Sequence, residues 1–122
     1  MSENSNIPIY DLEERTFQFA KNVRIWVKSL PKTISNIGDV KQLVRASGSV
    51  GANYIEANES LSKKDFVFTI MICRKESKES GYWLRLILET NENILEDKTG
   101  KLLIQESIEL KKIFSSMIGK SN

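Results

Sequence analysis

Residues 62–93 read SKKDFVFTIMICRKESKESGYWLRLILETNEN, and this stretch decides the fold. Ser62 is a residue that commonly caps helix N-termini, and Asp65 follows three positions later. Apolar and small side chains then recur at alternating steps of four and three, the spacing of a heptad seam. The seam consists of Phe66, Ile70, Cys73, Ser77, Ser80, Leu84 and Ile87. The pattern predicts one long helix that runs through about Asn93.

A second seam follows a different face of the same helix, more than about 90° from the first. A helix at the edge of a bundle needs only one buried face. This helix is therefore either central in its bundle or buried on its second face against another copy of the chain. Aromatic enrichment is typical of interface centres, and core packing within one copy stays open as the alternative. The candidate oligomer interface consists of Phe68, Ile72, Lys75, Glu79, Tyr82, Trp83 and Leu86.

Three further amphipathic segments flank this stretch. Residues 11–30 form the first, with acidic residues in the first turn and Pro31 behind it. The second begins near residues 36–39, with an apolar stripe on one inward face that extends to Tyr54 and Ile55, and the last follows a turn at 96–100. Its inward residues are expected to be Leu102, Leu103, Leu110, Ile113, Phe114 and Met117. The chain, residues 1–122, is predicted to be one all-α domain: an up-and-down antiparallel four-helix bundle with a long third helix and a flexible segment at 1–10.

Two glycines interrupt the second helix, at positions 48 and 51. Glycine inside a helix costs roughly 1 kcal/mol relative to alanine, so it usually marks a close backbone approach. Because the flanking pattern stays helical, tight packing against another helix is favoured over a loop that cradles a ligand.

Composition excludes several classes of function. The 122 residues include no His, which removes the usual general base and the commonest metal ligand. One Cys excludes an intrachain disulfide and fits a reducing compartment. No apolar run approaches the ~18 residues of a membrane span, and the N-terminus resembles no signal peptide. A cytoplasmic protein without a membrane role is expected.

Candidate chemistry is sparse. The pairs Glu56/Glu59 and Glu76/Glu79 would suit only a weak site for a hard cation, and solvated or ion-paired carboxylates on the surface are favoured. Cys73 lies on the main seam, where a buried inert thiol is favoured over a nucleophile. We therefore predict no catalytic residue, metal, cofactor or small-molecule substrate.

The charge balance is nearly even, with 18 basic and 16 acidic residues and a net charge of +2. No segment is a basic block, but two helical stripes have the spacing to follow a phosphate backbone. Both could equally be the polar exterior of amphipathic helices. Glu89 and Glu92 continue the second stripe and weaken it, because they add negative charge. The candidate nucleic-acid contacts are Lys21, Arg24 and Lys28 on the first helix, and Lys63, Arg74, Lys78 and Arg85 on the third.

Four blocks in this order, residues 15–21, 42–57, 62–66 and 73–85, resemble a family of bacterial four-helix-bundle proteins. Some members are encoded by intervening sequences within genes for large-subunit ribosomal RNA. The resemblance implies a cytoplasmic bundle that assembles as a ring, a pentamer in known members. A related branch, the accessory proteins of diversity-generating retroelements, binds nucleic acid through a basic surface. The chain departs from the family pattern in its near-neutral charge and at Glu56-Ala57-Asn58, where many members have glycine after the acidic residue.

Together, these observations predict a non-enzymatic, ring-forming helical bundle whose partners are other copies of itself and RNA. The alternative is a protein–protein adaptor or scaffold with no nucleic-acid role, which the low net charge favours.

Overall fold

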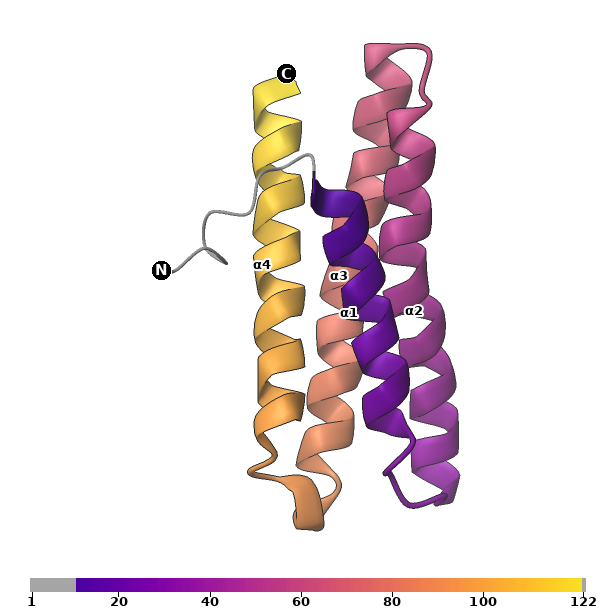
Figure 1. Ribbon diagram of the computed structural model, residues 1–122, viewed down its shortest axis with the longest axis vertical. Coiled ribbons are helices and arrows are strands. Elements are labelled where there is room, and N and C mark those ends of the chain that lie inside the picture. The colour runs from indigo at the N-terminus through magenta and orange to yellow at the C-terminus, as the bar shows by residue number, and fades with distance from the viewer. Residues whose placement is uncertain (1–10, 122) are drawn as a thin grey trace.

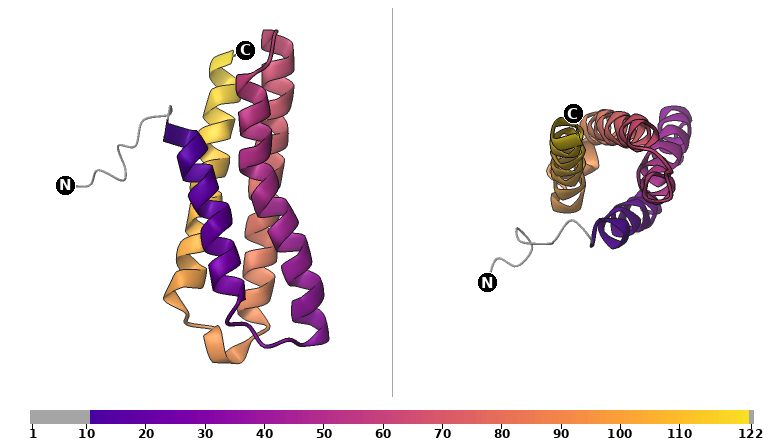
Figure 2. Two further views of the ribbon diagram at one scale, coloured as in Figure 1. Left: turned by 45° about the vertical axis from the view of Figure 1, so that its right-hand side comes forward. Right: turned by 90° about the horizontal axis from the view of Figure 1, so that it is seen from above.

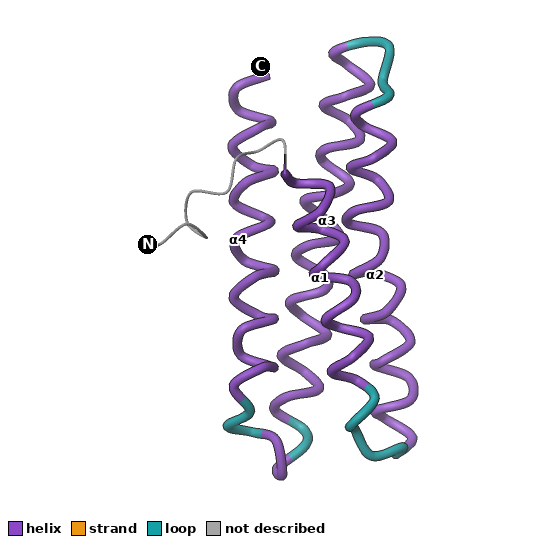
Figure 3. Tube along the Cα trace, viewed as in Figure 1, coloured by secondary structure: helices purple, strands orange, loops and turns teal. Residues whose placement is uncertain are grey.

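The computed structural model describes residues 11–121, with side chains to residue 120. Four helices run up and down side by side, and this part of the chain contains no strand (Figures 1 and 3). They are α1 (Leu12–Val27), α2 (Ile34–Asn58), α3 (Lys63–Glu89) and α4 (Lys98–Ser121), with a short 3₁₀ helix, η3 (Glu92–Ile94), before α4. The predicted all-α four-helix bundle is confirmed. The predicted flexible segment at 1–10 lies outside the described residues.

Side-chain caps set three of the helix starts. The Thr33 hydroxyl accepts a hydrogen bond from the Asn36 backbone N–H at 3.1 Å, and the Ser62 hydroxyl accepts one from the Asp65 N–H at 3.0 Å. At the start of α4, the Asp97 carboxylate accepts one from the Gly100 N–H at 2.7 Å. The predicted cap at Ser62 is therefore correct.

The predicted boundaries are wrong by up to a turn. The first helix ends at Val27 instead of residue 30, because the next backbone N–H groups bond to carbonyls only three residues back and tighten the chain into a turn. The second begins at Ile34, directly after its Thr33 cap. The third ends at Glu89 instead of Asn93, and the Asn91 side chain donates to the Ile87 carbonyl at 2.7 Å there.

The helices follow one another around the bundle (Figure 2). Packing is most extensive between α2 and α3 and between α3 and α4, less so between α1 and α2, and sparsest between α1 and α4. The first seam of α3 lies at the centre of this arrangement and is almost wholly removed from solvent. Its neighbours in the core include Phe19 and Val23 of α1, Leu43 and Val50 of α2, and Leu110 and Phe114 of α4.

The glycine-containing part of α2 is continuous helix, as predicted. A Cβ atom added at Gly51 would lie 2.8 Å from the Thr16 hydroxyl of α1, so the close approach inferred from the glycines is confirmed. Two predicted inward positions are wrong. Leu102 is 62% exposed because it faces the sparsely packed side of α4 toward α1, and Ile55 is 49% exposed because it lies at the edge of the α2 stripe.

None of the helices in the described residues combines the length and the apolar character needed to span a bilayer.

Candidate functional site

A cationic groove of about 610 Å³ lies between α3 and α4. Basic side chains come from both helices, and apolar side chains of α3 form the rest of its lining. No carboxylate is among the described residues that line it. The lining consists of Phe68, Met71, Ile72, Arg74, Lys75 and Lys78 of α3 with Lys111 and Ser115 of α4.

Helical spacing explains why these residues meet. Positions three and four apart share one face of a helix, which aligns Met71, Lys75 and Lys78 on α3 and aligns Lys111 with Ser115 on α4. Within residues 11–120, none of the four basic side chains forms an ion pair. Their charge is therefore not neutralised locally and is available to an anionic partner.

Only two of the seven predicted nucleic-acid contacts, Arg74 and Lys78, line this groove. Arg24 donates to the backbone carbonyls of Ala20 and Val44 at 3.0 and 3.2 Å, and Arg85 pairs with Glu89 at 2.9 Å. The remaining three are exposed elsewhere: Lys21 on α1, Lys28 directly after α1, and Lys63 at the start of α3. The structure thus does not bring the predicted set together into one surface.

The sequence interpretation missed Lys111, and it assigned Lys75 to the oligomer interface. No pattern within α4 distinguishes Lys111 from its neighbours. Its position beside the α3 cations depends on how the two antiparallel helices align, and a single helical wheel does not contain that information.

The predicted oligomer interface divides into two parts. Phe68 and Tyr82 are 65% and 60% exposed, and Lys75 is exposed beside them. The other members, Ile72, Glu79, Trp83 and Leu86, are half-buried, and Trp83 packs against the core.

Arg45 of α2 pairs with both carboxylates of the second predicted acidic pair. It lies 3.4 Å from Glu76 and 2.9 Å from Glu79. The hydrogen bond to Glu76 raises the pKa of Arg45. Glu76 is almost fully buried, and its Oε1 atom has no hydrogen-bond partner among the described residues. Ion pairing is confirmed for this pair, but the predicted surface location is wrong for Glu76, because it packs into the α2–α3 contact. Glu56 and Glu59 are exposed, as predicted.

The geometry of the described residues supports neither a nucleophilic Cys73 nor a cation site on the acidic pairs. Cys73 is completely buried, as predicted, and burial raises the pKa of its thiol to about 12. Within residues 11–120, no three His, Cys, Asp or Glu side chains gather as a metal site would require.

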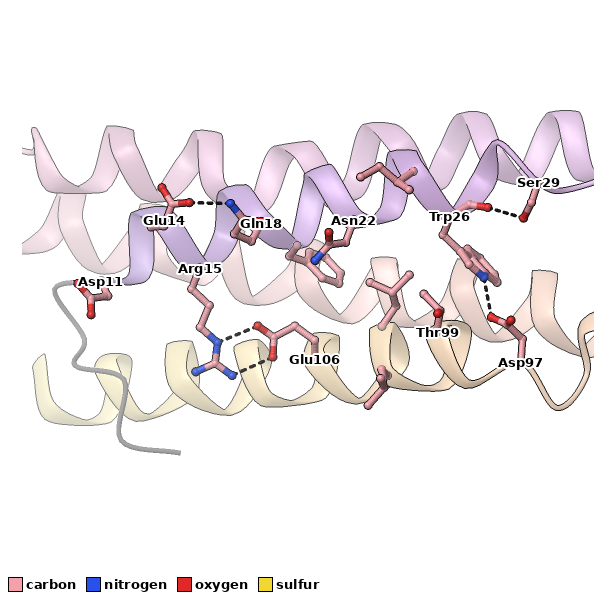
Figure 4. A pocket seen from close by; sticks show the side chains of 14 residues that line it. Asp11, Glu14, Arg15, Gln18, Asn22, Trp26, Ser29, Asp97, Thr99 and Glu106 are labelled. Carbon is pink, nitrogen blue, oxygen red and sulfur yellow. Dashed lines mark hydrogen bonds and ion pairs between the residues drawn. The ribbon is translucent and has the colours of Figure 1, made fainter. Parts of the chain in front are cut away.

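A second and larger groove, of about 1000 Å³, lies between α1 and α4 (Figure 4). At one end Arg15 donates to both carboxylate oxygens of Glu106, at 2.7 and 2.8 Å, and this contact raises the pKa of Arg15. At the other end the Trp26 indole N–H donates to the Asp97 carboxylate at 2.8 Å.

Between these ends the lining of the α1–α4 groove is mainly apolar. Phe19, Trp26 and Leu103 contribute to it from the core, and exposed Ile25 and Leu102 extend it outward. Its rim carries one basic side chain, Arg15, and four acidic ones: Asp11, Glu14, Asp97 and Glu106. The groove therefore suits an apolar segment that carries positive charge.

A family model described as 23S rRNA-intervening sequence protein matches residues 10–116. The chain is also similar to a crystal structure of a protein with unknown function from the S23 ribosomal protein family of Bacteroides thetaiotaomicron VPI-5482. The two share 28% sequence identity with a TM-score of 0.77, over 87% of this chain and 96% of that one. No curated protein matches significantly. With the family model spanning nearly the whole described bundle, the chain belongs to the 23S rRNA-intervening sequence protein family.

Proposed function

We propose that this protein is a non-enzymatic helical bundle that contacts RNA through the cationic groove between α3 and α4. One observation carries the proposal: four basic side chains from two helices line the groove, and no carboxylate among the described residues accompanies them. A net charge of only +2 is compatible with this role because the basic residues that matter are concentrated at one place.

Binding of this kind depends on salt, because neutralising phosphates releases bound counterions. If all four basic side chains contact phosphates of a single strand, the slope of log K against log salt concentration is about −3, at ~0.7 for each contact.

The test is fluorescence anisotropy of a labelled RNA at 50 and 200 mM salt (roughly the range over which such contacts weaken strongly). The double variant Lys78→Gln, Lys111→Gln should weaken binding. It should also make the slope of log K against log salt concentration less steep, by the contribution of about two phosphate contacts. The matched control, Lys21→Gln with Lys28→Gln, removes the same charge from exposed positions on α1 and directly after it, and should bind as the unmodified protein does. Absence of binding at low salt, or an equal loss in the control, would contradict the proposal.

We also propose that copies of the chain associate through half-buried apolar side chains of the second seam of α3 that lie outside the lining of the cationic groove: Trp83 and Leu86. Their partial exposure in one copy leaves apolar surface that association would bury. Light scattering coupled to size exclusion should give a pentamer mass, as the resemblance implies. Trp83→Asp should reduce that mass while circular dichroism shows intact helices. A monomer at micromolar concentration would contradict this.

A protein–protein adaptor is the second candidate, and the α1–α4 groove favours it. The apolar lining and excess of acidic groups fit a basic amphipathic helix from a partner protein. A synthetic leucine- and lysine-containing helical peptide should bind, and Leu102→Glu should weaken its binding by disrupting the apolar lining. If the peptide does not bind, or binds the Leu102→Glu variant equally well, the groove is not such a site.

A further inference from the structure

Two aromatic rings of α3 are exposed to solvent, Phe68 within the cationic groove and Tyr82 outside its lining, toward the C-terminal end of the helix. Phe68 is 65% exposed and lines the groove directly. Tyr82 is 60% exposed and lies one helical turn beyond Lys78 on the same helix. Exposed aromatic side chains next to uncompensated positive charge are the combination that single-stranded nucleic acids bind, by stacking and by phosphate contact together.

The spacing places both rings and the basic groups on one surface. Phe68 and Tyr82 are 14 residues apart, which is close to four turns and about 21 Å along the helix. Lys75 lies midway between them, and Lys78 lies between Lys75 and Tyr82. A strand that follows α3 would therefore meet a ring, then basic groups, then a second ring. Glu79, a carboxylate between Lys75 and Tyr82, is paired with Arg45 of α2 at 2.9 Å.

The Tyr82 ring is held in place before any ligand arrives. It meets the Trp83 ring edge to face, with centroids 5.0 Å apart and an interplanar angle of 81°. Trp83 in turn packs against the core. A ring fixed this way loses little conformational entropy when a base stacks on it.

We propose that the cationic groove binds single-stranded in preference to double-stranded nucleic acid, with bases stacked on Phe68 and Tyr82 while phosphates contact the lysines and Arg74. This inference rests on the proposed function and specifies its ligand. In a duplex the base faces already cover one another, so the two rings contribute nothing there and only the charges act. A single strand offers exposed base faces to both rings.

The experiment compares a labelled 12-nucleotide RNA, single-stranded, with the same RNA annealed to its complement. We expect at least tenfold tighter binding of the single strand. Phe68→Leu and Tyr82→Leu should each weaken single-strand binding about fivefold or more, leave duplex binding unchanged, and preserve the salt slope. Phe17→Leu is the matched control, because Phe17 is a similarly exposed ring on α1, outside the groove lining, and its loss should change neither affinity.

The outcomes separate this inference from the proposed function. Equal affinity for the two RNA forms, or equal losses on both in the ring variants, overturns stacking and leaves RNA contact standing. No binding of either form at low salt overturns both proposals. Light scattering on the ring variants provides the last check. A changed assembly mass with an unchanged preference for single strands would assign the rings to the contact between copies, and would also overturn the inference.

Discussion

Cys73 lies in the middle of the core, where its thiol has no access to solvent. Burial raises its pKa from 9.0 to about 12. Below pH 9 the thiol is protonated in both the folded and the unfolded chain, so it adds no pH dependence. Between pH 9 and 12 only the unfolded thiol ionises, and the free energy of unfolding should fall by about 1.4 kcal/mol per pH unit.

Urea unfolding of the unmodified protein and of Cys73→Ala at pH 8 and pH 10 tests this. The unmodified protein should lose about 1.4 kcal/mol more than the variant between the two pH values, because other titrating groups cancel in the comparison. Identical losses would show that the thiol is not shielded from solvent as the structure places it.

Arg45 neutralises the buried carboxylate of Glu76. Arg45→Ala should lower the free energy of unfolding by about 2 kcal/mol, less than for a fully buried pair because Arg45 itself is half exposed. Adding Glu76→Gln should recover part of that loss. Arg85→Ala, which breaks an exposed pair, should change the free energy of unfolding far less than Arg45→Ala does. Denaturant titrations measure all three, and equal losses for the two arginine variants would contradict this account.

At the scale of the helices, Gly51 sets how closely α1 and α2 approach. Gly51→Ala places a methyl group 2.8 Å from the Thr16 hydroxyl and should destabilise the protein by about 1–3 kcal/mol. Gly38→Ala lies in the same helix, but apart from its adjacent residues and its own helical backbone no described atom lies within 4 Å of the added Cβ. This variant should stabilise the protein by about 0.5–1 kcal/mol. Thermal unfolding of the two variants measures these changes. Shifts of the unfolding temperature in the same direction for both variants would refute the prediction.

Helical periodicity was sufficient to predict the four helices, their order and most of the core, because the pattern repeats over many turns. The ends were less predictable because single polar contacts decide them. The buried pair Asn36 and Asn91 is an example: each amide donates to the other, at 2.8 and 2.9 Å, and also to a backbone carbonyl. These residues are 55 positions apart, and no local pattern in the sequence connects them.

This amide pair joins the start of α2 to the end of α3, so the two side chains should stabilise the fold jointly and not independently. Asn36→Leu or Asn91→Leu alone leaves the other amide buried without its main partner, and each should cost about 1–3 kcal/mol of unfolding free energy. The double leucine variant should lose less than the two single losses added together, since no unpaired amide remains. A double-mutant cycle in urea measures this, and strict additivity would contradict it.

At the scale of the whole molecule, the site was less predictable than the fold. Helical wheels predicted Arg74 and Lys78 as nucleic-acid contacts, whereas the net charge of +2 indicated no cationic surface. Neither predicted the groove, because it forms only where α4 brings Lys111 beside α3. No sequence pattern predicted the α1–α4 groove, because the periodicity places Leu102 on the inward face of its helix, whereas the side chain is exposed. Periodicity predicts which face of a helix is apolar, but how tightly two faces close depends on packing in three dimensions.

The sparse packing between α1 and α4 also has a consequence for local unfolding of the bundle. α1 has 16 residues against 24–27 in the other helices, and it is held mainly by α2. It should therefore detach as a unit at a free energy below that of global unfolding. Hydrogen–deuterium exchange would then label the amides of α1 well before those of the α3 centre.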